Sequence, residues 1–399
     1  MSLLAKMLAD QGHDVTWWTS TFDHTHKRQR FRRDESVQAG KGLVLRLIHA
    51  RPYSANISVD RLVNHHQVAR GFERLAAVVA PEHQPDVIFA TMPTVELAAA
   101  AARFGHDRGI PVVVDVRDLH PDIYLSLIPR IARPLGRLAL TPLYRDLRTC
   151  LKLATGIVAI APSFLAWALR HAGRAERSSD AVFPLAYPEL DVSAEQLSVA
   201  EIELREAGVR SEMKIIWYVG TFNRWIDLET VIRAAGILSD EGQTDIQFVL
   251  SGSGGFDEEW RRQAAHLRNV IFTGWIDIPK IVCMRSVAFA GLAPYQPGFL
   301  TVGNKLFEYM AGGLPILLSI GGDAKTIIEQ HDAGIAYEGK NAESLAAAIR
   351  KMLVPGVQQR MATNSLKAYR EHFSASKVYG AMVNFILGFA RSAANAKNR

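Results

Sequence analysis

Short apolar runs rich in β-branched residues alternate along the chain with longer segments of helical periodicity. The short runs predict strands, and apolar positions three and four residues apart predict helices. The predicted strands of the first half are residues 14–19, 43–48, 86–90, 111–115, 156–159 and 181–183. Those of the second half are residues 214–219, 246–251, 270–273, 287–292 and 315–319. Helical patterns such as 59–79, 94–104 and 228–238 separate them, which predicts α/β domains with parallel sheets.

The length of 399 residues exceeds that of one ordinary domain of roughly 150 residues. Two prolines, Pro184 and Pro188, interrupt the regular pattern near the middle, and a charged helix is expected at residues 194–207. We therefore predict an N-terminal domain at 1–188 and a second domain at 189–375. Residues 376–399 should form a C-terminal helix that packs back on the N-terminal domain. The expected architecture is two doubly wound Rossmann-like domains facing across a cleft.

The start of the chain departs from this pattern. The first clear periodicity is a helix at residues 3–11, which ends at Gly12 and leads into the strand 14–19. A doubly wound domain ordinarily begins with a strand and a turn that points into the cleft. The sequence thus predicts that the first strand of the N-terminal domain is missing.

Composition restricts the class of protein. The chain is 48% hydrophobic and 22% charged, which is ordinary for a globular protein. Its two cysteines, Cys150 and Cys283, are far apart and outside any CxxC motif, so neither a disulfide framework nor a zinc site is expected. The uncharged segment 378–390 is shorter than the roughly 20 residues of a membrane-spanning helix. We expect a cytoplasmic protein in a reducing compartment.

The net charge of +6 arises in the first half, because residues 191–399 hold equal numbers of acidic and basic residues. One basic cluster is Lys27–Arg33, and a second consists of Arg130, Arg133, Arg137, Arg145 and Arg148. Anionic lipid headgroups and nucleic-acid phosphates would both fit such charge. No nucleic-acid motif accompanies the clusters, so we expect peripheral contact with an anionic membrane and no nucleic-acid partner. A solvated loop and an ordinary surface helix are the alternative.

Two glycine-containing turns follow predicted strands of the second half. Gly220 and Arg224 follow the strand 214–219, and Gly252 and Gly254 follow the strand 246–251. At the carboxyl ends of parallel strands such turns can hold phosphate, with Arg224 supplying a cationic fork. The spacing is not GxGxxG, and no GxSxG is present, so a dinucleotide fingerprint and a serine-hydrolase elbow are both excluded there. Tight-turn geometry alone is the alternative for these glycines.

The most informative segment is 291–315, where a strand leads into a long loop and then a short helix that begins near Asn304. Gly303 precedes this helix, Lys305 adds charge at its N-terminus, and Glu308 lies one turn further along. A helix N-terminus offers free N–H groups to phosphate, and a carboxylate can accept both hydroxyls of a ribose. The alternative is that Glu308 caps the helix.

The segment Gly303–Pro315 resembles the signature of retaining GT-B glycosyltransferases of family 4, in the branch that builds bacterial surface polysaccharides. Companion segments at 219–222, 250–254, 269–274 and 332–335 agree in order and spacing. The resemblance implies transfer of a sugar from a nucleotide diphosphate donor, a UDP-sugar above all, without a metal or other cofactor. It implies that Glu308 binds ribose, that Asn304 and Lys305 face diphosphate or sugar, and that Arg224 faces diphosphate. Leu300 stands where many members have a first glutamate.

On the acceptor side, Asp118 and His120 follow the strand 111–115 and resemble an Asp-rich turn of the family. We predict that they orient the acceptor hydroxyl or the transferred sugar, because proton transfer needs a titratable group in reach. An alternative is that Arg117 pairs structurally with Asp118 or Asp122. The acceptor implied by the resemblance is lipid-linked or a growing saccharide, and the leaving diphosphate itself assists as base.

Two other functions fit parts of the pattern. A UDP-sugar 2-epimerase shares the two-domain architecture, although no carboxylate cluster favours it. A non-catalytic subunit that binds nucleotide sugars or acts as a scaffold is suggested by the missing strand and by Leu300.

Overall fold

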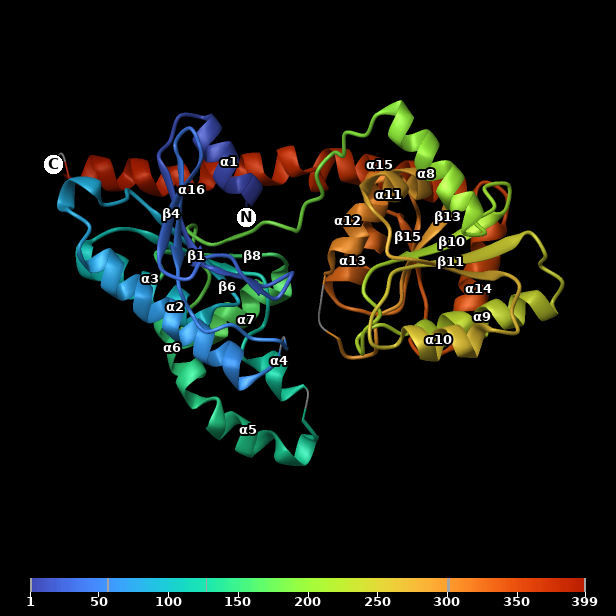
Figure 1. Cartoon of the computed structure of the whole chain (residues 1–399), viewed down its shortest axis with the longest axis horizontal. Helices are drawn as coiled ribbons and strands as arrows, with labels where there is room; N and C mark the ends of the chain where they lie inside the picture. The colour runs from blue at the N-terminus through green and yellow to red at the C-terminus, as the bar shows by residue number, and fades with distance from the viewer. Residues whose placement is uncertain (1, 56, 127, 300–301, 398–399) are drawn as a thin grey trace. The chain divides into compact units, whose positions relative to one another are not determined.

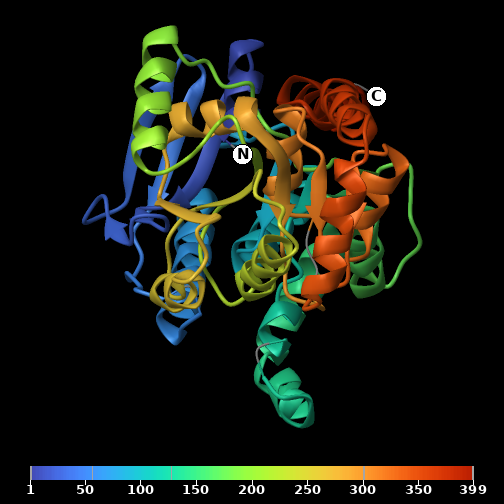
Figure 2. The ribbon, with the colours of Figure 1, turned by 90° about the vertical axis from the view of Figure 1, so that its right-hand side faces the viewer.

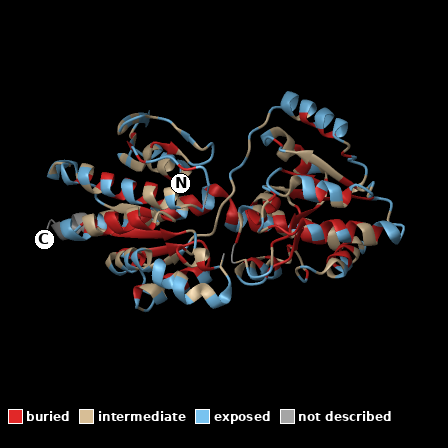
Figure 3. Ribbon diagram, turned by 60° about the horizontal axis from the view of Figure 1, so that its bottom comes forward, coloured by how far each residue is buried: buried red, intermediate tan, exposed pale blue. Residues whose placement is uncertain are grey.

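The computed structural model describes residues 2–55, 57–126, 128–299 and 302–397, and the chain divides into two compact units (Figure 1). Unit 1 comprises residues 1–184 and 379–399, and unit 2 comprises residues 185–378. In each unit the buried residues concentrate on the strands and on the inner faces of the helices (Figure 3). Each unit therefore has its own hydrophobic core.

Unit 2 contains one six-stranded parallel sheet with the order β12-β11-β10-β13-β14-β15. Its strands are β10 (Lys214–Val219), β11 (Ile246–Ser251), β12 (Val270–Gly274), β13 (Ala288–Ala293), β14 (Ile316–Leu318) and β15 (Gly334–Ala336). All residues of β11 are buried, as is Trp217 of β10, because helices cover both faces of the sheet. The chain adds β11 and β12 on one side of β10, and then adds β13, β14 and β15 on the other side. This strand order is that of a doubly wound sheet.

The helices of unit 2 have amphipathic sequences that bury one face. They are α8 (Ala194–Glu206), α9 (Leu228–Asp240), α10 (Asp257–Ala264), α11 (Ile278–Val287), α12 (Asn304–Ala311), α13 (Asp323–Gln330), α14 (Ala342–Leu353) and α15 (Val357–Ala368), followed by the π-helical turn Tyr369–Phe373. Ser193 begins α8 with a capping box, and the Asp227 side chain accepts the Thr230 amide at the start of α9. These caps fix the residues at which the two helices begin.

Among its described residues, unit 1 contains two larger sheets, besides a two-stranded hairpin, where a doubly wound domain would have one sheet. The first has the order β1-β5-β4, and the second has the order β6-β7-β8-β9. The strands are β1 (Val15–Ser20), β4 (Glu35–Gly40), β5 (Leu43–Ile48), β6 (Ile88–Met92), β7 (Val112–Val116), β8 (Gly156–Ala159) and β9 (Ala181–Val182). Within the described ranges no strand joins β1 to β6. Trp17 and Trp18 of β1 are only half-buried, whereas β7 and β8 are buried throughout.

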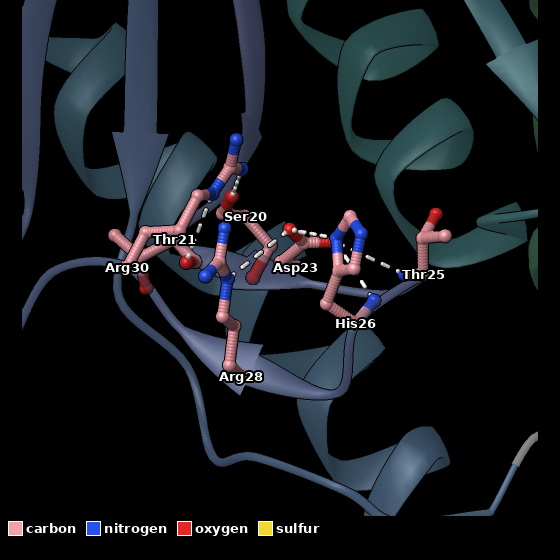
Figure 4. Close-up of polar contacts among 7 residues, drawn as sticks. All are labelled: Ser20, Thr21, Asp23, Thr25, His26, Arg28 and Arg30. Atoms are coloured by element: carbon pink, nitrogen blue, oxygen red, sulfur yellow. Dashed lines mark hydrogen bonds and ion pairs between the residues drawn. The ribbon is translucent and has the colours of Figure 1, made fainter.

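The basic cluster Lys27–Arg33 begins in a small hairpin that the periodicity did not predict. The hairpin pairs β2 (Phe22–Asp23) with β3 (Arg28–Gln29) directly after the carboxyl end of β1. Asp23 holds its tip, since its carboxylate accepts the Thr25 and His26 amides and His26 Nδ1 (Figure 4). The hairpin is thus a defined structure at the edge of the unit 1 sheet where ligand sites are expected.

The helices of unit 1 pack on its sheets and on one another. They are α1 (Ser2–Asp10), α2 (Val59–Ala77), α3 (Val95–Arg108), α4 (Asp122–Leu125), α5 (Arg133–Ala139), α6 (Thr141–Leu153), α7 (Pro162–Ala172) and the 3₁₀ turns Pro81–His83 and Arg130–Ala132. Helix α16 (Ala375–Lys397) brings the chain back, and its Phe385 packs edge-on against Phe183. Among the described helices, none is long and apolar enough to cross a membrane.

Candidate functional site

Two loops at the carboxyl end of the unit 2 sheet are joined into one structure. The loop after β10 and the loop after β13 exchange backbone hydrogen bonds, from the Asp227 amide to the Pro294 carbonyl at 2.7 Å and from the Gln296 amide to the Trp225 carbonyl at 2.8 Å. An antiparallel bridge pairs Ile226 with Tyr295. The loop that carries Arg224 and the loop that leads to α12 are therefore held together by backbone hydrogen bonds.

The structure brings Gly220 and Lys305 together. Gly220 has a φ of 144°, and a Cβ built there would lie 2.4 Å from Lys305 Nζ. Only glycine leaves room for the ammonium group, which also lies 5.1 Å from the centroid of the Tyr218 ring. Burial lowers the pKa of Lys305, while the nearby Glu308 carboxylate opposes that shift. A desolvated cation at a helix N-terminus beside a glycine turn is suited to bind a phosphate.

The turn after β11 lies against the turn after β10. The Gly220 amide donates to the Ser251 carbonyl and the Phe222 amide to the Ser253 carbonyl, both at 2.9 Å. A Cβ at Gly252 would lie 1.9 Å from the Gly220 carbonyl oxygen, and one at Gly254 would lie 2.3 Å from that of Phe222. The close approach of the two turns is therefore enough to explain why Gly252 and Gly254 are glycines, in line with the alternative of tight-turn geometry.

Glu308 lies in the second turn of α12 and is half-buried. Since the first turn has no acidic residue and Gly303 provides no side-chain cap, the capping alternative for Glu308 is wrong. Burial raises the pKa of Glu308, against the lowering effect of Lys305, Arg285 and the Tyr187 hydroxyl. That hydroxyl donates to Glu308 Oε1 at 3.4 Å. A carboxylate with two cations nearby can accept hydroxyl groups of a ligand while remaining charge-compensated.

Arg285 and Tyr187 were not predicted from the sequence. Arg285 lies in α11, and its guanidinium is 5.5 Å from the centroid of the Tyr187 ring. A Cβ at Gly312 would lie 2.9 Å from three atoms of the Arg285 side chain, so this glycine makes room for it. Both residues lie outside the α12 segment, and no local motif marks them. The glycine at position 312, next to the end of α12, is the one sequence feature that the Arg285 side chain requires.

Other predicted donor residues lie at the surface of unit 2. Arg224 is exposed, with its guanidinium 5.4 Å from the Trp225 ring centroid, and Trp225 stacks on Phe299 at 4.8 Å. Asn304 is the exposed first residue of α12, and Gly303 is its N-cap. Leu300 lies outside the described residues.

In unit 1, Asp118 and His120 follow β7 at the carboxyl edge of the sheet. Asp118 is exposed, whereas His120 is buried and packs edge-on against Tyr124. Burial, reinforced by the positive charge of Arg61, lowers the pKa of His120 to about 4. At neutral pH this imidazole is therefore uncharged, and it can accept or donate one hydrogen bond.

The alternative in which Arg117 pairs with Asp118 or Asp122 is wrong, because Arg117 pairs with Asp115. Arg117 Nε lies 2.8 Å from Oδ2 of Asp115, which is fully buried in β7 and needs a charged partner there. Asp122 instead accepts the indole N–H of Trp167 at 2.7 Å and the hydroxyl of Tyr144. Burial alone would raise the pKa of Asp122, but hydrogen bonds from His171, Tyr144 and Trp167 lower it to about 2. Asp122 thus anchors the segment that carries Asp118 and His120.

Unit 2 presents a cation and a carboxylate on a helix that follows a glycine-lined turn, and unit 1 presents a titratable turn on a second sheet. Two parallel α/β units with such loops at the carboxyl ends of their strands define the GT-B class of fold.

Comparison with known proteins identifies the family. The family described as "Glycosyl transferases group 1" matches residues 213–354, and the family described as "Glycosyl transferase 4-like domain" matches residues 1–179. The chain belongs to the group 1 glycosyltransferases, a class of transferases. It is also 26% identical over 186 residues to an uncharacterized glycosyltransferase of Methanocaldococcus jannaschii. That match covers 45% of this chain and 46% of the relative, so it spans about half the length of that protein.

Solved structures of low sequence identity share the fold. Sucrose-phosphate synthase from Thermosynechococcus elongatus is 17% identical with a TM-score of 0.72, over 98% of this chain and 92% of that one. WaaG, a glycosyltransferase involved in lipopolysaccharide biosynthesis, is 16% identical with a TM-score of 0.66, over 97% and 95%. HepE from Anabaena in complex with UDP is 16% identical with a TM-score of 0.59, over 86% of each chain. The two fold expectations, parallel α/β sheets and a GT-B arrangement of elements, are confirmed.

Proposed function

We propose that the protein transfers a sugar from a nucleotide diphosphate sugar, a UDP-sugar above all, to a lipid-linked or growing saccharide acceptor, with retention of the anomeric configuration. The observation that carries the proposal is the arrangement of Gly220, Lys305 and Glu308. Lys305 would stabilise the diphosphate as it leaves, and Glu308 would hold the ribose. A fixed cation aimed at the charge that develops on the leaving group lowers the barrier without reorganisation.

On the acceptor side the proposed roles fall to Asp118 and His120. The exposed Asp118 would orient the attacking hydroxyl, and the neutral His120 would hold the acceptor or the transferred sugar through one hydrogen bond. Gly252 and Gly254 would support the donor turn through its backbone, and Arg224, Gly303 and Asn304 would border the diphosphate and sugar. The residues named require no metal for these roles.

Incubation of the purified protein with a panel of UDP-sugars and lipid-linked acceptors should release UDP only when both substrates are present. The anomeric configuration of the product, determined by NMR, would report retention or inversion. Conversion of the donor sugar without acceptor would instead favour an epimerase. Failure of every nucleotide sugar to bind in calorimetry would contradict the proposal.

We further propose that the protein works as a peripheral protein at the cytoplasmic face of an anionic membrane, through the segment 130–139. Ile131, Leu135 and Leu138 of this segment are 91%, 72% and 72% exposed. Residues 123–145 include Arg130, Arg133, Arg137 and Arg145 and no acidic residue. In Figures 1 and 2 α5 extends away from the strands of unit 1. Exposed apolar side chains among arginines are typical of a segment that inserts at a lipid interface.

Vesicle binding tests this segment. The double substitution of Leu135 and Leu138 by Ser should weaken binding to vesicles of phosphatidylserine and phosphatidylcholine by roughly 30-fold, from about 2 kcal/mol of lost apolar insertion. Val78 is 81% exposed at the end of α2, so Val78→Ser is the matched control and should bind as wild type. Equal cosedimentation of all three proteins with the vesicles would exclude insertion by α5.

A further inference from the structure

Tyr187 lies near the start of unit 2, where the chain enters that unit, and its backbone is bonded to the segment by which the chain leaves it. The Tyr187 amide donates to the Phe373 carbonyl at 3.3 Å, and the Ala375 amide donates to the Tyr187 carbonyl at 3.1 Å. The Tyr369 hydroxyl donates to the same Tyr187 carbonyl at 3.0 Å. Three hydrogen bonds that do not involve the Tyr187 side chain therefore fix the position of this residue.

The π-helical turn that holds Tyr187 also packs on the helix that carries Glu308. The ring centroid of Phe373, at the end of this turn, lies 4.9 Å from that of Phe307 in α12, and both rings are buried. Phe307 directly precedes Glu308 in the sequence. Packing around Phe373 thus sets the separation between Tyr187 and α12, and a change that removed only the Tyr187 hydroxyl would leave this packing intact.

The Tyr187 side chain reaches from this position to the carboxylate. Its hydroxyl lies 3.4 Å from Glu308 Oε1, and its ring lies beside Arg285, whose guanidinium is 5.5 Å from the ring centroid. Burial, reinforced by the negative charge of Glu308, raises the pKa of Tyr187 to about 12. The hydroxyl therefore keeps its proton at neutral pH and donates it to the carboxylate.

Glu308 retains the capacity to accept further hydrogen bonds. An ionised carboxylate has about four acceptor positions on its two oxygens, and Tyr187 occupies one of them at Oε1. Lys305 and Arg285 act on this carboxylate through their charge and form no ion pair with it in the described part of the chain. A carboxylate that is anchored by one donor presents its other acceptor positions in one orientation, which is what recognition of two adjacent hydroxyls requires.

We propose that Tyr187 is a positioning residue for the donor nucleotide, because its hydroxyl holds Glu308 in the orientation that accepts both ribose hydroxyls while Arg285 keeps the tyrosine ring in place. This inference rests on the proposed function, since it supposes that Glu308 binds ribose. A site arranged to accept two hydroxyls discriminates against a ligand that lacks one of them. Tyr187 thus contributes to the selection of ribonucleotides over 2′-deoxyribonucleotides.

Calorimetric titration of the full-length chain with UDP and with 2′-deoxy-UDP tests the role of Tyr187. We expect the wild type to prefer UDP by roughly tenfold. Tyr187→Phe should bind UDP roughly fivefold more weakly and 2′-deoxy-UDP almost unchanged, so that the preference falls to about twofold. Tyr53→Phe, which removes a hydroxyl that lies 2.7 Å from His24 Nδ1 in unit 1, should keep the preference of the wild type. Partial unfolding would instead weaken the binding of both nucleotides alike.

A double substitution shows whether Tyr187 acts through Glu308. When Glu308→Ala is already present, adding Tyr187→Phe should change the affinity for UDP by less than about twofold. A further fivefold loss in this background would show that Tyr187 acts independently of the carboxylate and would overturn the proposal. If Tyr187→Phe does not fold, Arg285→Gln serves in its place, because it frees the tyrosine ring and should also lower the preference for UDP.

The remaining outcomes separate this role from the proposed function. Binding of neither nucleotide to the wild type contradicts the proposed function itself, and the role of Tyr187 with it. If the wild type binds UDP, three results overturn the role of Tyr187 alone. These are equal affinity of the wild type for the two nucleotides, an unchanged preference in Tyr187→Phe, and tighter binding of UDP by Tyr187→Phe, which would show that the hydroxyl competes with ribose.

Discussion

Substitution of Glu308 by Ala should weaken the binding of UDP about 30-fold, which corresponds to about 2 kcal/mol. The carboxylate is half-buried near the positive charges of Lys305 and Arg285, and charge-assisted hydrogen bonds from ribose hydroxyls to it would be lost. Isothermal titration calorimetry of wild type and variant measures the change directly. Burial raises the pKa of Glu308, so this carboxylate takes up its proton at a higher pH than an ordinary glutamate does. When the solution is acidified, the affinity of the wild type for UDP should therefore begin to fall at that higher pH.

Two further variants make this test specific. Glu308→Gln keeps the shape of the side chain and removes its charge, so it should lose affinity while the thermal unfolding of the protein stays close to that of wild type. Glu258→Gln removes an exposed carboxylate from α10 and should bind UDP normally. If Glu308→Ala binds UDP as tightly as wild type, the assignment of α12 to the nucleotide is wrong.

Substitution of Gly252 by Ala should destabilise unit 2 by about 3 kcal/mol. The residue has a φ of 154°, and the added methyl group would lie 1.9 Å from the Gly220 carbonyl oxygen. The clash is with backbone, so the two turns must separate and the hydrogen bonds of Gly220 and Phe222 to the β11 turn must lengthen. Urea unfolding followed by tryptophan fluorescence would measure the loss.

Gly255 provides the matched control in the same turn. A Cβ at Gly255 meets nothing within 4 Å, and its φ is not positive, so Gly255→Ala should unfold within about 0.5 kcal/mol of wild type. Equal stability of the Gly252→Ala and Gly255→Ala proteins would show that the contact between the turns is not needed. Loss of UDP binding in Gly252→Ala alone would connect this contact to the donor loops.

The parallel sheets were predictable because their strands are continuous apolar runs. Strands β5, β8, β10 and β11 have the bounds that the pattern predicts, and the others differ by up to two residues at their ends. Strand β15 was not predicted because Gly334–Ala336 contains only one β-branched residue, Ile335. The strands β2, β3 and β4 were not predicted either, because β2 and β3 have two residues each and β4 is a polar edge strand paired with β5.

The candidate site was predictable only where its residues are close in sequence. The spacing from Gly303 to Glu308 places Lys305 and Glu308 on one helix, and the structure gives that helix the expected start at Asn304. Tyr187 and Arg285 reach Glu308 from other elements through tertiary packing, which no local pattern encodes. The Arg117 alternative failed because Asp115 is buried within β7 and needs a charged partner there, whereas Asp118 is exposed and Asp122 already accepts hydrogen bonds from Trp167 and Tyr144.

The division of the unit 1 strands into separate sheets leaves two strand edges, at β1 and at β6, without a neighbouring strand among the described residues. The Val15 amide donates toward β5, so the alternate amides of β1, those of Thr16 and Trp18, point away from β5. In the same way the Ile88 amide donates toward β7, and the Phe89 amide of β6 points away from β7. Two rows of backbone donors and acceptors flanked by half-buried tryptophans form a template for any extended polypeptide. Each of these two edges has room in its hydrogen-bonding pattern for one more extended segment.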